Sequence, residues 1–144
     1  MFMGTYQHTI DTKNRLIIPA KFRNQLGDSF VVTRWMEHSI RAYTQEGWDA
    51  FSKQVRALPE TNAKARQFKR FVLGGAQEVE FDKQGRITLT KSLCEYAQLE
   101  KETTVFGLGE DSFEIWSTAN WQAYEENVAE NFDDIADGLD DLGI

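Results

Sequence analysis

The sequence contains one motif twice, and this duplication limits what the chain can fold into. Residues 11–19 read DTKNRLIIP and residues 82–90 read DKQGRITLT, so Asp-x-x-x-Arg followed by alternating apolar residues recurs 71 positions later. A second match, SIRAYTQEGW at 39–48 with SFEIWSTANW at 112–121, has an offset of 73. Two copies are too few for a solenoid, so we predict one pseudo-twofold module.

Each copy begins with a pattern that is typical of a β-hairpin. Tyr6, His8 and Ile10 alternate toward one face, and a tight turn follows. The matching apolar positions are Leu16 and Ile18 after the first turn, and Val79, Phe81, Ile87 and Leu89 in the second copy. The residue before the arginine is Asn14 in one copy and Gly85 in the other. Both types tolerate a positive φ, which the turn is expected to need.

After each hairpin, the pattern predicts a short helix, two strands and a closing helix. Pro19 opens the first short helix, with Phe22 and Leu26 facing inward. Leu93 and Ala97 take these inward positions in the second copy. The predicted strands are SFVVTRW (29–35), SIRAYT (39–44), TTVFGLG (103–109) and SFEIWS (112–117). The closing helices start near Trp48 and Trp121, with Thr44 and Ser117 as candidate N-caps.

A basic helix is predicted to link the two copies. Asn62 can cap it and Gly74 can end it. Its bases are Lys64, Arg66, Lys69 and Arg70, and a solvated helix face is the simpler explanation for them. The predicted organisation is a single α+β module, 1–144, made of a first repeat (4–58), a linking helix (59–74), a second repeat (75–130) and an acidic C-terminal tail (131–144).

The C-terminal end has an apolar seam with acids between its members. Heptad spacing relates Val128, Phe132, Ile135, Leu139 and Leu142. We therefore expect this helix to pack against the body or a neighbouring subunit. The acids then form its solvated face, and a DNA-mimicking or autoinhibitory tail is the sharper alternative.

Charge is distributed unevenly along the chain. Residues 1–74 carry twelve bases and six acids, whereas residues 75–124 carry four bases and nine acids. Residues 125–144 add eight acids and no base, which gives the net charge of −7. A basic half attached to an acidic remainder suggests a polyanionic partner for the basic half. An acidic tail that balances a basic body within one assembly explains the same numbers.

The sequence contains little that suggests an enzyme. Its only histidines, His8 and His38, lack the spacing of a metal site with the single cysteine, Cys94. We predict a core or interface role for His8 and a packing role for Cys94. No metal, cofactor or small-molecule substrate is predicted. One cysteine fits a reducing cytoplasm, and neither a signal peptide nor a membrane span is predicted.

The repeated turns carry the candidate binding residues. Asp11 and Arg15 flank a three-residue loop, as do Asp82 and Arg86, so each pair can clasp its turn. The clasp does not explain the other bases around the first turn, which are Lys13, Lys21 and Arg23. The second copy keeps Lys83, Arg86 and Lys91. Lysines can contact phosphates, and arginine can contact guanine edges in the major groove of a duplex.

Three segments of the sequence resemble the MraZ family of bacterial transcriptional regulators. They are MFMGTYQHTIDTKNRLIIPAKFR, ALPETNAKARQFKRFVLGGAQEVEFDKQGRI and the closing IADGLDDLGI. The resemblance implies an AbrB-like swapped-hairpin (double-split β-α-β) fold and ring-shaped homo-oligomers. It also implies binding of short direct repeats in the promoter of the division and cell wall gene cluster, usually as an autorepressor, in the nucleoid.

The family motif falls on Asp11 with Arg15 and on Asp82 with Arg86. We expect Arg15 to be the main DNA contact. Its predicted supporting residues are Lys13, Asn14, Lys21 and Arg23. Arg86 and Lys83 are predicted to form either a second DNA site or part of a turn. The second copy has Thr90 and Cys94, where the family tends toward proline and a basic residue. The first copy is therefore expected to carry more of the DNA contact.

Two other functions fit parts of the same sequence. A protein-interaction scaffold ring without nucleic acid would explain the acidic tail and the net charge. RNA binding ranks last, because the aromatic residues fall on apolar faces rather than beside bases in an exposed sheet pattern. Promoter DNA with direct repeats, scrambled DNA and single-stranded RNA would separate the three hypotheses.

Overall fold

A computed structural model describes residues 1–143 of the chain as an α+β protein. The strands are β1 (Thr5–Thr9), β2 (Arg15–Ile17), β3 (Ser29–Trp35), β4 (Ser39–Tyr43), β5 (Gln77–Glu80), β6 (Arg86–Thr88), β7 (Glu102–Gly107) and β8 (Ser112–Ser117). The α-helices are α1 (Ala20–Leu26), α2 (Gln45–Arg56), α3 (Ala63–Gly74), α4 (Lys91–Tyr96), α5 (Thr118–Glu130) and α6 (Phe132–Asp137). Two short 3₁₀ helices are η1 (Met36–His38) and η2 (Asp140–Leu142).

The two repeats exchange their first strands. The main sheet has the order β1-β7-β8-β4-β3-β5, so β1 lies beside the β7–β8 hairpin of the second repeat. Strand β5 lies in the same way beside the β3–β4 hairpin of the first repeat. Strands β4 and β8 meet at the centre, and β2 pairs with β6 in a separate two-stranded ribbon. Neither repeat contains a complete sheet, which explains why the sequence carries both.

The predicted local hairpin of each repeat is wrong in its pairing. β1 continues into the turn but pairs with β7, and β2 pairs with β6. The two sides of the first turn are joined by the isolated bridge between Ile10 and Leu16 and by the Asp11 N–H, which donates to the Arg15 carbonyl at 3.0 Å. An alternating pattern fixes which face of a strand is buried but not which strand lies beside it.

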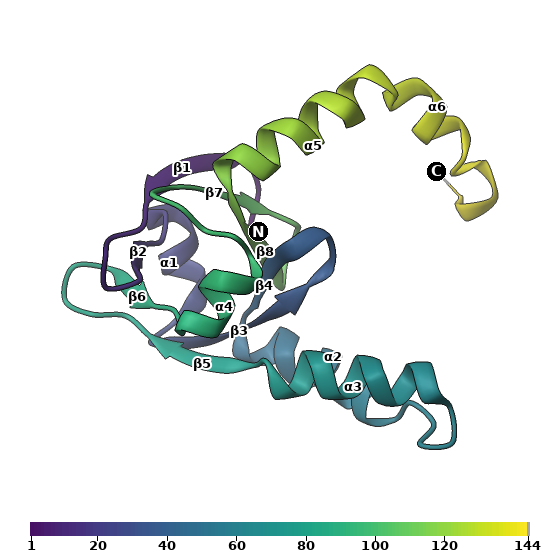
Figure 1. Cartoon of the computed structure of the whole chain (residues 1–144), viewed down its shortest axis with the longest axis horizontal. Helices are drawn as coiled ribbons and strands as arrows, with labels where there is room; N and C mark the ends of the chain where they lie inside the picture. The colour runs from purple at the N-terminus through teal and green to yellow at the C-terminus, as the bar shows by residue number, and fades with distance from the viewer. Residues whose placement is uncertain (144) are drawn as a thin grey trace.

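The core lies between the main sheet and a layer made of the β2–β6 ribbon with α1 and α4 (Figure 1). Leu16 and Ile87 face each other across this ribbon, and both side chains are fully buried. The inward positions predicted for the short helices are confirmed, since Phe22, Leu26 and Leu93 are all buried. The helices α2 and α5 contact the sheet from its other side, where Tyr43 and Trp116 are buried.

The helix boundaries follow the capping residues that the sequence predicted. The side chains of Thr44, Asn62 and Ser117 accept hydrogen bonds from the first turns of α2, α3 and α5. Gly74 is the last residue of α3, as expected. The linking helix therefore forms where predicted, and with α2 it makes an arm that projects from the sheet (Figure 1).

The C-terminal seam does not pack against the body, which was one of the two partners that the sequence predicted for it. Helix α5 is anchored at its start, where Trp121 stacks on Phe106 at a ring-centroid distance of 4.2 Å. Beyond this the chain extends away from the sheet (Figure 1), and the helix breaks at Asn131. Phe132 is 61% exposed and Leu142 is 74% exposed. A neighbouring subunit remains the predicted partner for these side chains.

Candidate nucleic-acid interface

The first Asp-x-x-x-Arg turn is held by one carboxylate. Asp11 Oδ1 accepts the backbone N–H groups of Lys13 and Arg15, each at 2.9 Å. Its Oδ2 accepts Arg15 Nε at 2.6 Å. The backbone of Asn14 donates to the Asp11 carbonyl at 3.0 Å, and Asn14 has the predicted positive φ of 61°. The aspartate thus fixes both the turn and the direction of the arginine side chain.

The second turn repeats these bonds. Asp82 Oδ1 accepts the N–H groups of Gln84 and Arg86 at 2.9 Å, and Oδ2 accepts Arg86 Nε at 2.7 Å. Gly85 takes the left-handed position with a φ of 76°. The shared geometry means that the duplicated motif encodes the turn itself, whatever else it does.

The pKa values of Asp11 and Asp82 are both lowered, so both carboxylates are charged at neutral pH. The N–H of Arg15 is the largest cause that lowers the pKa of Asp11, and the N–H of Arg86 has the same effect on the pKa of Asp82. Hydrogen bonds to the charged form favour that form. Because each bond to the carboxylate engages Nε, the outer edge of each guanidinium is left for another acceptor. Such a presentation suits a phosphate or a base edge.

The two turns lie at the same end of the molecule, opposite the helical arms (Figure 1). Arg86 Nη1 is 3.9 Å from Asp11 Oδ2, so one arginine reaches the carboxylate of the other repeat. The register of the ribbon, with Ile17 opposite Arg86, brings the turns together. Lys13 and Lys83 are exposed at the two loops, and Lys21 is exposed on α1. The two turns, with Arg15 and Arg86, therefore lie close together on one surface.

Arg23 is the exception among the predicted contact residues. Its Nη1 donates to the carbonyl of Ile18 at 2.6 Å. A Cβ built on Gly85 would lie 2.8 Å from its guanidinium, so the side chain occupies the space beside the second turn. The bases around each turn therefore come from both repeats, which sequence alignment alone does not reveal.

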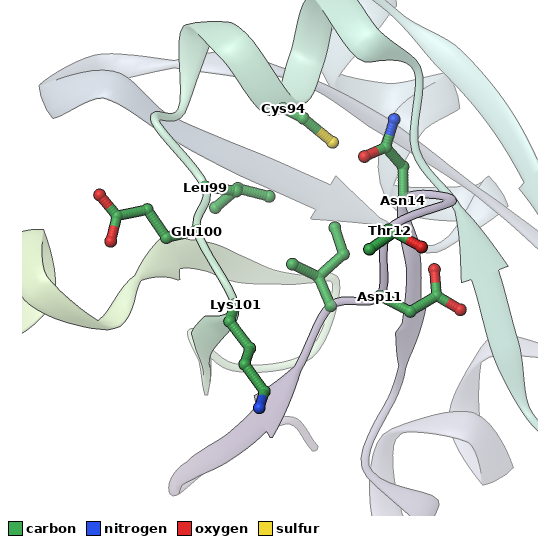
Figure 2. A pocket seen from close by; sticks show the side chains of 8 residues that line it. Asp11, Thr12, Asn14, Cys94, Leu99, Glu100 and Lys101 are labelled. Carbon is green, nitrogen blue, oxygen red and sulfur yellow. The ribbon is translucent and has the colours of Figure 1, made fainter.

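The equivalent position in the second repeat is Cys94, and the structure leaves a cavity there. Asn14 and Cys94 line this cavity of about 510 Å³ beside the first turn. Figure 2 shows its residues, with Leu99 on the far side from Asn14. Burial raises the pKa of the Cys94 thiol to about 11, so the predicted packing role is supported over a nucleophilic one.

His8 has the environment expected from its strand position. It is half-buried on β1, and burial followed by the charge of Arg23 lowers its pKa. Within residues 1–143, no group of three or more His, Cys, Asp or Glu side chains could hold a metal ion. In the same residues, no helix is long and apolar enough to cross a membrane.

One charged pair was missed by the sequence reasoning. Arg41 and Glu114 are opposite each other on β4 and β8, and Arg41 Nε donates to Glu114 Oε2 at 3.1 Å. Glu114 is buried and also accepts Trp116 Nε1 at 2.8 Å. The repeat alignment contained the signal, because it places Arg41 and Glu114 at equivalent positions with opposite charge. Their contact joins the two halves at the centre of the sheet.

The fold and the turns together define a tandem-repeat α+β protein whose halves exchange strands and present two clasped arginines. A family profile described as "MraZ protein, putative antitoxin-like" matches residues 1–71 and again residues 72–142. The transcriptional regulator MraZ of Leuconostoc citreum (strain KM20) is 60% identical over 142 residues, which cover 99% of each chain. That of Oenococcus oeni (strain ATCC BAA-331 / PSU-1) is 57% identical over 144 residues and 100% of each chain. The chain belongs to the MraZ family of transcriptional regulators.

Proposed function

We propose that the chain binds double-stranded promoter DNA through its two Asp-x-x-x-Arg turns. The observation that carries the proposal is the pairing of these turns on one surface, each with an arginine held through Nε by its own aspartate. A fixed guanidinium loses little conformational entropy when it meets a phosphate or a guanine. Lys13, Lys21 and Lys83 surround the pair as mobile charges for the DNA backbone.

The proposed regulatory role is repression of the chain's own promoter, in the division and cell wall gene cluster. Short direct repeats in that promoter would each meet one pair of turns. A ring of identical subunits would then engage several repeats at once, and the linked contacts would raise the overall affinity. The net charge is −7, so the protein as a whole does not attract DNA. The positive charge at the turns would therefore guide binding. Binding of this kind would keep the protein at the nucleoid.

The exposed C-terminal helices α5, α6 and η2, called the C-terminal arm below, support the assembly part of the proposal. Phe132 and Leu142 are apolar side chains exposed far from the sheet, where water would otherwise surround them. Burial of both against a second copy would stabilise an oligomer by roughly 1.5–3 kcal/mol per side chain. Native mass spectrometry of the wild type and of Phe132→Glu would test this, and an unchanged subunit number would contradict a role for the arm.

The DNA contact is tested by a titration with promoter DNA that carries direct repeats. Arg15→Ala should weaken binding to this DNA by roughly 1–3 kcal/mol if the arginine reads a guanine. If it contacts a phosphate instead, the slope of log K against log salt should decrease by about 0.9. Arg56→Ala is the matched control, since Arg56 is exposed on α2, away from the turns. Equal affinities of wild type and Arg15→Ala at matched salt would refute the assignment.

The alternative is a scaffold ring whose partners are proteins. The exposed apolar arm and the acidic residues 125–144 favour it. This alternative predicts that repeat DNA and scrambled DNA give the same affinity and that Arg15→Ala behaves as the wild type. The titration therefore distinguishes the two functions directly.

A further inference from the structure

A different side chain lies beside each of the two turns, and in both cases it belongs to a helix of the opposite repeat. Beside the second turn, Gly85 contacts the guanidinium of Arg23 from the first repeat. Beside the first turn, Asn14 shares a cavity with Cys94 from the second repeat. Positions 14 and 85 are equivalent in the repeat alignment, and so are positions 23 and 94. Each turn is thus matched to one helix residue of the opposite repeat.

Size explains the pairing of residue types. At Gly85 a Cβ would approach the Arg23 Nη1 and Cζ atoms to 2.8 Å, so a side chain there displaces the guanidinium. Cys94 is much shorter than arginine, and Asn14 can therefore carry a side chain at the same backbone position. The large helix residue occurs with the turn that lacks a side chain, and the small one occurs with the turn that has one.

Hydrogen bonds connect this pairing to the turn backbone. The N–H of Ile18 donates to the Gly85 carbonyl at 3.3 Å, and the Ile18 carbonyl accepts Arg23 Nη1 at 2.6 Å. On the other side the N–H of Leu89 donates to the Asn14 carbonyl at 2.9 Å. Arg23 therefore makes a charge-assisted bond to Ile18, whose own N–H donates to the Gly85 carbonyl of the second turn, whereas Cys94 leaves a cavity beside the first turn.

We propose that Arg23 is a positioning residue that holds the second turn, and through it Arg86, in its binding geometry. The effect of Arg23 on DNA affinity rests on the proposed DNA-binding function, whereas its support of the second turn is argued from the structure alone. Arg23 acts through Ile18 and Gly85, and its guanidinium does not itself contact the duplex. The first turn lacks this support, because Cys94 stands at the equivalent helix position.

Amide hydrogen exchange tests the mechanism without DNA. Arg23→Met should increase exchange at Gly85 and Arg86 by about tenfold, the factor that corresponds to loss of one hydrogen bond of about 1.4 kcal/mol. Exchange at Asn14 and Arg15 should not change, which provides an internal reference. Lys53→Met is the matched control, because Lys53 is exposed on α2, away from the turns. Unchanged exchange at Gly85 and Arg86 would overturn the proposal.

A second set of variants keeps the arginine and displaces it. Gly85→Asn tolerates the positive φ, as Asn14 does at 61°, but its side chain needs the space of the guanidinium. Gly85→Asn should lower the melting temperature of the wild type. In a chain that already carries Arg23→Cys, the same substitution should lower the melting temperature less, because asparagine and cysteine then occur together as they do at the first turn. Additive effects of the two substitutions would contradict the coupling.

DNA titration separates positioning from direct contact. If Arg23 positions the second turn, Arg23→Met should weaken binding to repeat DNA while the slope of log K against log salt stays unchanged. A slope that decreases by about 0.9 with unchanged exchange would instead make Arg23 a phosphate contact and overturn the proposal. If the wild type does not distinguish repeat DNA from scrambled DNA, the proposed function fails. The exchange experiment still decides whether Arg23 holds the turn.

Discussion

Truncation of Leu16 is expected to unfold both repeats together rather than one. Leu16 has no exposed surface and faces Ile87, 1% exposed, across the ribbon between the repeats. Leu→Ala at a fully buried site costs about 2–5 kcal/mol, because the surrounding side chains fill only part of the cavity. That is a large share of the roughly 5–15 kcal/mol that stabilises a typical domain. Ile17→Ala is the matched control, since Ile17 lies on the same strand and is 40% exposed.

The assay is urea unfolding at a fixed protein concentration, followed by tryptophan fluorescence and by far-ultraviolet circular dichroism. A fixed concentration matters because subunit assembly adds to apparent stability. Trp35 and Trp48 report on the first repeat, and Trp116 and Trp121 report on the second. We expect one transition for both probes, shifted strongly by Leu16→Ala and by less than about 1 kcal/mol in the control. Two separate transitions would refute the argument that the exchanged strands make the repeats one folding unit.

Three further predictions concern charged and ionisable groups. Glu114→Ala should destabilise the protein by about 3–5 kcal/mol in thermal unfolding, because it leaves Arg41 near the sheet centre without its buried partner. A loss of stability below about 1 kcal/mol would contradict this prediction. Alkylation of Cys94 at pH 8 should be much slower in the native protein than in urea, because burial raises its pKa to about 11, and equal rates would exclude the buried position. Asp11 and Asp82 should titrate below the ordinary carboxyl range by NMR. Since their folded pKa values are lowered, their contribution to stability is present above the unfolded pKa and is lost as pH falls through the folded pKa. Asp82→Asn should reduce that acid-dependent loss, and an unchanged acid limb would contradict it.

Local chemistry in the sequence predicted the local structure well. The positive φ at Asn14 and Gly85 follows from residue type, and the caps at Thr44, Asn62 and Ser117 follow from side-chain oxygens placed before helical segments. The clasp between Asp and Arg also follows from spacing alone, because a three-residue turn brings its flanking residues together. These features depend on neighbours within a few residues, which the sequence displays directly.

The partners of strands and of the C-terminal arm depend on distant contacts. β1 has the same alternation whether it pairs with β2 or with β7, so periodicity could not distinguish a closed hairpin from an exchanged strand. The apolar seam at Phe132 and Leu142 similarly predicts burial without identifying the surface that provides it. Such information is carried by the fold of the whole chain rather than by any single segment.

The exchange also changes how positive charge should be assigned to the two turns. By sequence order, Arg23 belongs to the first copy and Cys94 to the second, which made the second copy look less equipped for DNA. In the structure Arg23 lies against Gly85, whereas Cys94 lies beside Asn14. The extra guanidinium is therefore next to the second turn, and a comparison of the copies by sequence order assigns it to the wrong one. That the first turn carries more of the DNA contact stays a prediction, and the position of Arg23 beside Gly85 no longer supports it.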